Sequence, residues 1–268
     1  MDSFLALLSS INSFVWGPFL LIPLLLLTGL YLTIRLRGLQ FRVLGHAFWL
    51  AFVKRSEKGN VPGDVSHYQA LATALAATVG VGNIAGVATA IGIGGPGALF
   101  WMWMTGLLGM ATKYSEALLG VKYRVTDAKG EQSGGPMYYL TNGVGGWFGK
   151  SLGIAFAIFG VLASFGIGNM VQSNTAAHQL YDTWGVSPVV SGLCLALVTA
   201  VVIIGGIKSI GRFAAAVVPL MIVLYIACII VVLVAFADRL PAAIALIFTD
   251  AFSLSLIHIS EPTRRRGI

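Results

Sequence analysis

Long apolar runs alternate along this chain with short segments that carry nearly all of its charges. Bilayer hydrocarbon is about 30 Å thick, so a helix that crosses it needs about 20 apolar residues. Six runs reach that length, and a seventh begins at Pro241. The pattern therefore predicts an all-α polytopic membrane protein, with helices at residues 14–34, 68–93, 98–119, 151–177, 188–207 and 213–237.

The run at residues 68–93 contains a glycine-rich segment, Thr-Val-Gly-Val-Gly-Asn-Ile-Ala-Gly, at residues 78–86. Glycine weakens a helix, and an unpaired backbone group in hydrocarbon is costly. A break at this depth is tolerated only where it faces protein, water or a bound ligand. We therefore predict a discontinuous helix at residues 78–83, and a binding site at the break.

Composition and charge support the membrane assignment. Hydrophobic residues make up 57% of the chain and charged residues 10%, whereas soluble domains carry roughly 25% charged residues.

Asp2 stands where a signal peptide would have a basic segment, so we expect the first run to be retained. Cys194 and Cys228 are isolated on apolar runs, which favours packing over a disulfide or metal site.

The net charge of +7 reports orientation in the membrane and does not require a nucleic-acid partner. Lysine and arginine gather in every second loop, and the loops between these basic loops contain a single basic residue, Arg239. Because cytoplasmic loops are enriched in lysine and arginine, the pattern predicts a multi-pass protein of the plasma membrane with its N-terminus outside. The basic loops contain Arg35, Arg37, Arg42, Lys54, Arg55, Lys58, Lys122, Arg124, Lys129, Lys150, Lys208 and Arg212.

The predicted break offers two opposite polar ends. The downstream half of the helix begins with free N–H groups that suit a carboxylate, and the upstream half ends with free carbonyls that suit a small cation. Asn83 could accept from an ammonium group, coordinate a cation or donate to a carboxylate. It could equally be a capping residue that satisfies only local backbone groups.

Residues 80–85 also match the dinucleotide-binding pattern Gly-x-Gly-x-x-Gly/Ala. That pattern requires a preceding strand and an acidic residue about 20 positions later. Here the flanks are apolar helix, and residues 98–106 contain no acid. A nucleotide site is therefore excluded.

The segment resembles the Val-Gly-x-Gly-Asn unwound region of the neurotransmitter:sodium symporters, which have the leucine-transporter-like fold. The resemblance implies that the amides of Val81 and Gly82 hold a substrate carboxylate. It also implies one sodium at the carbonyls of Ala76 and Val79, and a second at the Thr78 carbonyl and the Asn83 side chain. The substrate-binding residues expected at the break are Thr78, Gly80, Val81, Gly82 and Asn83.

More of the chain is similar to the alanine or glycine:cation symporter family, over residues 1 to about 252. The similarity rests on Gln-Ala-Leu at 69–71, the 78–88 segment, Gly-Gly-Pro-Gly-Ala-Leu-Phe-Trp-Met-Trp at 94–103, Gly-Gly-Pro-Met-Tyr-Tyr at 134–139 and Asn-Met-Val-Gln-Ser-Asn at 169–174. It implies an extra N-terminal helix followed by a five-plus-five inverted repeat. Gln172 would contact the substrate amino group, although interhelical hydrogen bonding or exposure at the outer interface also explains this residue.

By this resemblance the chain is the N-terminal half of a transporter, with a transporter domain at residues 1–252 that ends early in the second repeat. We expect residues 253–268 to be a non-native tail, or alternatively a genuine basic tail that stops translocation. Without the second repeat, the polypeptide alone is expected not to transport.

The expected function is symport of sodium with a small neutral amino acid such as alanine or glycine, by alternating access. The expected partners are that amino acid, sodium and the lipid bilayer, without a further cofactor. Proton coupling is the nearest variant, but it usually requires a buried titratable group, which the predicted helix around the break lacks. A channel or a structural membrane subunit is the alternative from another class. An enzyme is not expected, because no run clusters a nucleophile, a base or metal ligands.

Other polar and aromatic positions have simpler interpretations. Trp101 and Trp103 favour an aromatic belt at the outer membrane interface over a substrate cage. Lys113 and Glu116, three residues apart, predict an ion pair near a helix end. Residues 134–140 could form a short interfacial helix, a cytoplasmic gate or a plain connector.

Overall fold

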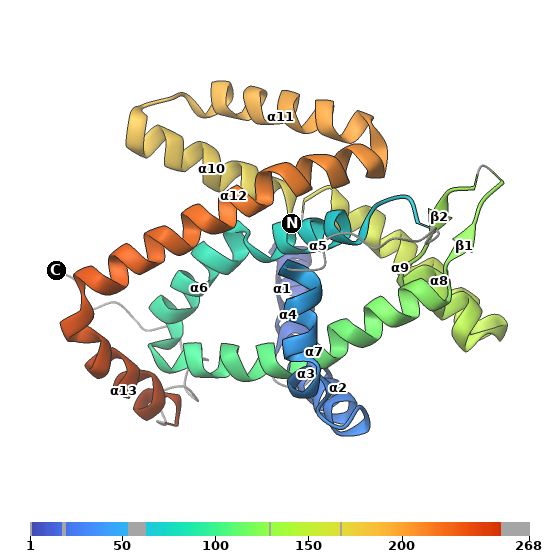
Figure 1. The fold of residues 1–268 in the computed structure, drawn as a ribbon, viewed down its shortest axis with the longest axis horizontal. Coiled ribbons are helices and arrows are strands. Elements are labelled where there is room, and N and C mark those ends of the chain that lie inside the picture. The colour runs from blue at the N-terminus through green and yellow to red at the C-terminus, as the bar shows by residue number, and fades with distance from the viewer. Residues whose placement is uncertain (1, 18–19, 53–62, 129, 167, 253–268) are drawn as a thin grey trace.

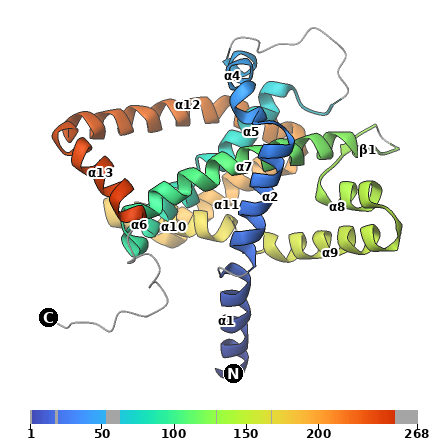
Figure 2. The same cartoon turned by 90° about the horizontal axis from the view of Figure 1, so that it is seen from below.

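The computed structural model describes residues 2–17, 20–52, 63–128, 130–166 and 168–252. The predicted first helix at 14–34 is wrong in its start, because a helix already begins at Asp2 and a separate one begins at Leu21. Figure 2 shows α1 extending away from the other helices. Two short helices occupy part of the segment expected to be a loop. The elements are α1 (Asp2–Trp16), α2 (Leu21–Arg35), α3 (Leu39–Arg42) and α4 (Leu44–Phe52).

The predicted break in the second apolar run is confirmed. Helix α5 (His67–Thr78) begins with a capping box, in which the Ser66 side chain accepts from the Gln69 amide and the Gln69 side chain accepts from the Ser66 amide. Helix α6 (Val81–Gly94) follows after two non-helical residues. A short turn then leads to α7 (Gly97–Lys122), so α6 and α7 are neighbours in sequence and in space (Figure 1).

The predicted helix at 151–177 is wrong as a single element. The structure has α9 (Gly146–Ser164) and α10 (Asn169–Trp184) in its place. Gly168 has a φ of +90°, which L residues with side chains rarely adopt, so a regular helix cannot continue through it. The segment before α9 contains a short helix, as one interpretation predicted. Its elements are β1 (Val125–Thr126), β2 (Gln132–Ser133), α8 (Pro136–Tyr139) and a π-helical turn (Leu140–Val144). Burial is the largest cause that raises the pKa of Tyr139, and the negative charge of Glu116 is the second.

The remaining helices are α11 (Pro188–Ile204), α12 (Gly206–Ala235) and α13 (Leu240–Ala251), with a 3₁₀ turn at Ala237–Arg239. The prediction of a loop at residues 208–212, between the fifth and sixth runs, is wrong. Lys208 and Arg212 lie in the first two turns of α12, because a turn at Gly205 and Gly206 is enough to reverse the chain. Basic residues near a membrane interface can occupy the end of a helix as readily as a loop.

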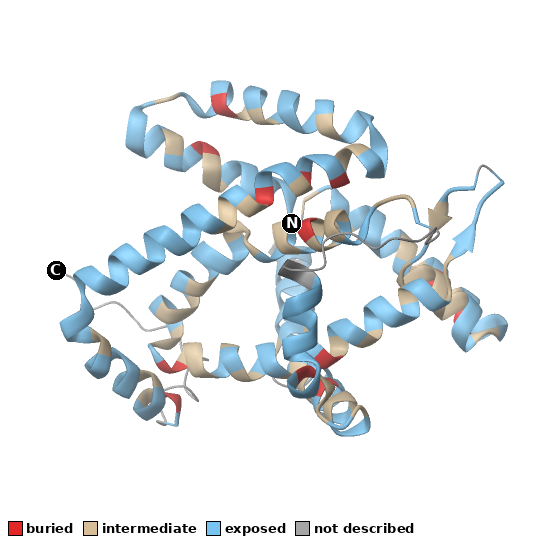
Figure 3. Ribbon diagram, in the orientation of Figure 1, coloured by how far each residue is buried: buried red, intermediate tan, exposed pale blue. Residues whose placement is uncertain are grey.

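The best-packed contact joins α5 to α12, where Ala72, Ala214 and Val218 are buried together. Elsewhere the buried apolar residues of the described chain are small, and many large apolar residues are exposed. Exposed positions follow most of the helices (Figure 3). Four helical stretches of the described chain are long and apolar enough to cross a membrane: Phe4–Arg35, His67–Gly94, Gly146–Trp184 and Gly206–Ala235. A shorter apolar helix covers Pro188–Ile204. These features confirm an all-α, multi-pass membrane protein.

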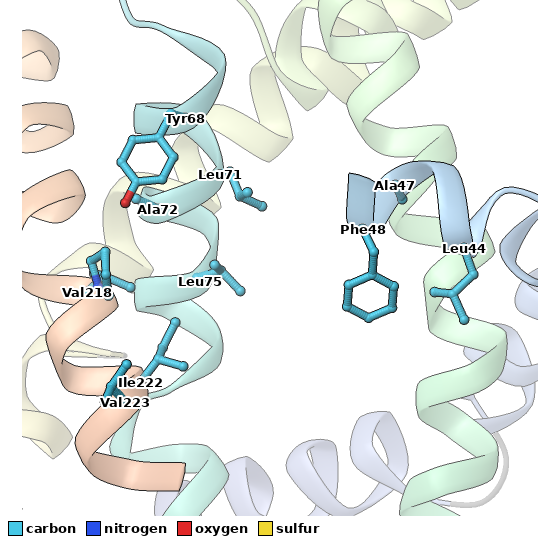
Figure 4. Close-up of a pocket in the computed structure, with 11 residues that line it drawn as sticks. Leu44, Ala47, Phe48, Tyr68, Leu71, Ala72, Leu75, Val218, Ile222 and Val223 are labelled. Carbon is cyan, nitrogen blue, oxygen red and sulfur yellow. The ribbon is translucent and has the colours of Figure 1, made fainter. Parts of the chain in front are cut away.

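An apolar pocket of about 430 Å³ lies between α4, α5 and α12. Phe48 and Leu44 face it from α4, and Leu71 and Leu75 from α5 (Figure 4). None of residues 76–83 lines it. The pocket is therefore separate from the predicted binding site.

Candidate functional site

The interruption between α5 and α6 consists of Val79 and Gly80. The Val79 amide still donates to the Leu75 carbonyl, with 2.9 Å between nitrogen and oxygen. Gly80 is then extended, with φ −115° and ψ 171°, so the helical path ends there. Helix α6 starts at Val81, and the Asn83 amide donates to the Gly80 carbonyl at 3.0 Å. The chain thus changes from one helix to another within two residues.

The start of α6 presents free backbone donors. In the part of the chain that the structure describes, the amides of Val81 and Gly82 donate no hydrogen bond. The first amides of any helix lack an intrahelical acceptor, and the helix dipole adds positive potential at that end. These two groups have the chemistry that a carboxylate requires.

The end of α5 presents the complementary acceptors. Among the described residues, the carbonyls of Ala76 and Val79 accept no hydrogen bond. Ala76 itself packs beside the buried cluster between α5 and α12, which holds this end of the helix in place. Unpaired carbonyl oxygens are ligands that a hard cation such as sodium prefers.

The Asn83 side chain bridges the break, because its Nδ2 donates to the Thr78 carbonyl. The Thr78 hydroxyl donates in turn to the Ala74 carbonyl at 3.1 Å. Asn83 therefore has the local capping contact that was one of its two interpretations, and its Oδ1 stays available for a ligand. A cation held by both Thr78 and Asn83 requires the Asn83 amide to turn over.

Gln172 lies beside the break although it is 92 positions from Gly80 in the sequence. A methyl group on Gly80 would lie 3.8 Å from Gln172 Nε2 and 4.0 Å from its Oε1. Helices α6 and α10 also contact each other. The structure therefore brings the one distant predicted site residue to the predicted break.

The other polar and aromatic candidates lie away from the break. Lys113 and Glu116 form the predicted ion pair, with 2.9 Å between Nζ and Oε2. Both side chains are largely exposed, so the pair contributes at most about 1 kcal/mol to stability. The described residues contain no group of three or more His, Cys, Asp or Glu that could hold a metal ion.

Trp101 contributes to a contact between α7 and α13 that the sequence did not indicate. Its Nε1 donates to the Ala251 carbonyl at 3.0 Å, and the Gly97 amide donates to Asp250 Oδ2 at 3.0 Å. Trp103 stacks edge-on against Phe248 in the same contact. The pair of tryptophans thus packs against α13, and among the described residues their rings contact Phe100, Phe248 and Phe252.

Comparison with known proteins identifies the family. The profile of the sodium:alanine symporter family matches residues 1–260. The sodium/alanine symporter AgcS of Methanococcus maripaludis is 52% identical over 253 residues, which cover 94% of this chain and 55% of AgcS. An uncharacterized transporter of Haemophilus influenzae is 48% identical, covering 92% of this chain and 53% of that protein. The amino-acid carrier protein AlsT of Bacillus subtilis is 38% identical, covering 96% and 53%.

The chain thus spans about half the length of the relatives that it matches. The names of the family and of AgcS describe a transporter and not an enzyme. The family match covers residues 1–260. It includes both the interruption between α5 and α6 and the apolar helices that are long enough to cross a membrane. This chain belongs to the sodium:alanine symporter family.

Proposed function

We propose that the full-length protein, meaning one that reaches the length of the relatives, couples sodium entry to the uptake of alanine or another small neutral amino acid such as glycine. The observation that carries the proposal is the interruption between α5 and α6. It puts free amides and free carbonyls within a few residues of each other. A zwitterion and a cation need these two kinds of group together.

The proposed substrate site is built from both sides of the break. The amides of Val81 and Gly82 hold the carboxylate, with Thr78, Gly80 and Asn83 forming the surrounding backbone. The Gln172 side chain accepts a hydrogen bond from the ammonium group through Oε1. The observation behind this role is the proximity of Gln172 to Gly80.

The proposed sodium site uses the carbonyls of Ala76 and Val79, and a second one would use Thr78 and Asn83. Sodium so held lies near the bound carboxylate, so that each favours binding of the other. One sodium ion crossing a potential of 100 mV supplies about 2.3 kcal/mol, which sustains a roughly 50-fold accumulation of substrate. Backbone carbonyls hold sodium without a titratable side chain, which favours sodium over proton coupling.

The proposed architecture is the leucine-transporter-like inverted repeat. In this arrangement α1 and α2 precede the first repeat, and α13 leads towards the second. The two repeats would rock around the break to expose it alternately to each side, with the N-terminus outside. Much of the exposed apolar surface would then be covered by the second half of the protein and by lipid.

Replacing sodium with choline tests the proposed coupling. Uptake of labelled alanine by the full-length protein in liposomes is expected to saturate in sodium and to fall to background in choline, because choline cannot fit the carbonyl site. Linear uptake that is indifferent to sodium would support a channel instead. Uptake that persists in choline and follows an imposed pH gradient would indicate proton coupling.

Gln172→Ala is expected to raise the dissociation constant for alanine about tenfold or more, because hydrogen bonds to charged groups contribute about 1.5–3 kcal/mol. Equilibrium binding of labelled alanine to the purified full-length protein measures this change. Gln179→Ala is the matched control, since Gln179 lies on the same helix and its Nε2 donates to Thr183 at 3.1 Å. Equal affinities for the two variants would place the amino group elsewhere.

A further inference from the structure

One six-residue pattern occurs twice in this chain. Residues 78–83 read Thr-Val-Gly-Val-Gly-Asn, and residues 164–169 read Ser-Phe-Gly-Ile-Gly-Asn. Each copy has a hydroxyl residue, an apolar residue, Gly, an aliphatic residue, Gly and Asn in that order. The first copy is the break described above, and the second falls between α9 and α10.

The two copies also share a side-chain contact. Helix α5 ends at Thr78, whose carbonyl accepts from Asn83 Nδ2. Helix α9 ends at Ser164, whose carbonyl accepts from Asn169 Nδ2 at 2.9 Å. In both copies the last residue of the pattern therefore ties the start of one helix to the last carbonyl of the helix before it. Repetition in sequence and in contact indicates that the second interruption is a built feature.

Asn169 holds the first turn of α10 by three contacts. Besides its bond to Ser164, its Oδ1 accepts from the Met170 amide at 2.7 Å. Its backbone carbonyl also accepts from the Ser173 hydroxyl at 2.9 Å, a contact that an alanine at this position would keep. Gln172 lies in this same turn, and its side chain reaches Gly80. The position of Gln172 at the first break thus depends on the geometry of the second.

We propose that Asn169 is a positioning residue, which fixes the angle between α9 and α10 so that Gln172 stays beside Gly80. The proposal rests on the proposed function, in which Gln172 binds the substrate amino group. Without the Asn169 contact, the glycines at 166 and 168 leave the angle free, and Gln172 occupies its place for only part of the time. Apparent affinity falls in proportion to that fraction.

A double-mutant cycle separates positioning from general stabilisation. Asn169→Ala is expected to raise the dissociation constant for alanine about 3- to 10-fold, as when the competent fraction falls to about 10–30%. In a Gln172→Ala background the same substitution should change it little, because the residue it positions is gone. Additive effects, or an Asn169→Ala protein that binds like the parent, would overturn the proposal.

Asn174→Ala is the matched control, since Asn174 is an exposed asparagine on the same helix and lies outside the repeated pattern. It is expected to leave alanine affinity unchanged. Melting of both variants checks that they fold. A control that weakens binding as much as Asn169→Ala would also overturn the assignment.

A distance measurement tests the positioning role of Asn169 without any substrate. Spin labels at Phe159 on α9 and Tyr181 on α10, both exposed, report the angle between the helices once Cys194 and Cys228 are replaced by serine. Asn169→Ala is expected to broaden the distance distribution, and Asn174→Ala is not. If Asn169→Ala leaves the distance distribution unchanged, the positioning role is overturned, even if alanine still binds. Absence of alanine binding by the parent protein would count against the proposed function and leave this readout valid.

Discussion

Asn83→Ala in the full-length protein is expected to reduce sodium-dependent alanine uptake about 10- to 100-fold, because it removes groups that contribute about 1.5–3 kcal/mol each when they contact charge. The substitution deletes the donor that bridges the break to the Thr78 carbonyl. It also deletes the Oδ1 that is available to sodium or substrate. Initial rates of labelled alanine uptake into liposomes, at several sodium concentrations, measure the loss.

The control for this prediction is Thr89→Ala on the same helix. The Thr89 hydroxyl donates to the Ala85 carbonyl at 2.9 Å, a local bond two turns beyond the break. Its loss is expected to leave uptake near the parent rate. If Asn83→Ala transports at the parent rate with parent sodium dependence, Asn83 is only a helix cap and the proposed site loses one of its members.

Gly97→Ala is expected to lower the free energy of unfolding by about 3 kcal/mol, the upper part of the range for overpacking. A Cβ atom at this position would lie 2.5 Å from the carbonyl carbon of Asp250 and 2.7 Å from the Cα of Ala251. These are backbone atoms that cannot turn aside, so α13 must move away from α7. The hydrogen bonds from the Gly97 amide and from Trp101 would weaken together.

Thermal unfolding of the purified full-length protein measures this effect, with Gly106→Ala as the control. Gly106 is on the same helix, and a Cβ atom there would meet nothing within 4 Å. Its replacement should be neutral or slightly stabilising, because alanine is the better helix former. Equal melting temperatures for the two variants would show that α13 does not pack on α7 as described.

The break between α5 and α6 could be predicted because its signal is local. Three glycines and an asparagine in an uncharged run weaken a helix wherever the run is placed. The interruption before Asn169 carries the same signal, but it was hidden by the length of the apolar run around it. A search for the Gly-x-Gly-Asn pattern would have found both interruptions.

The proximity of Gln172 to Gly80 could be expected only from the resemblance to known symporters. Nothing local in either segment specifies a neighbour 92 positions away. The contact of Asp250 with the Gly97 amide was missed for the same reason, because a lone acid near the end of an apolar helix does not name its partner. Helix ends such as Gly206 depend on turn geometry, which apolar periodicity does not report.

The most direct test is a structure of the full-length protein with alanine and sodium bound. The proposed site predicts that both carboxylate oxygens lie about 3 Å from the amide nitrogens of Val81 and Gly82, the usual hydrogen-bond distance. It also predicts a cation at the carbonyls of Ala76 and Val79. Alanine bound away from the break, with these amides and carbonyls still free, would contradict the central claim.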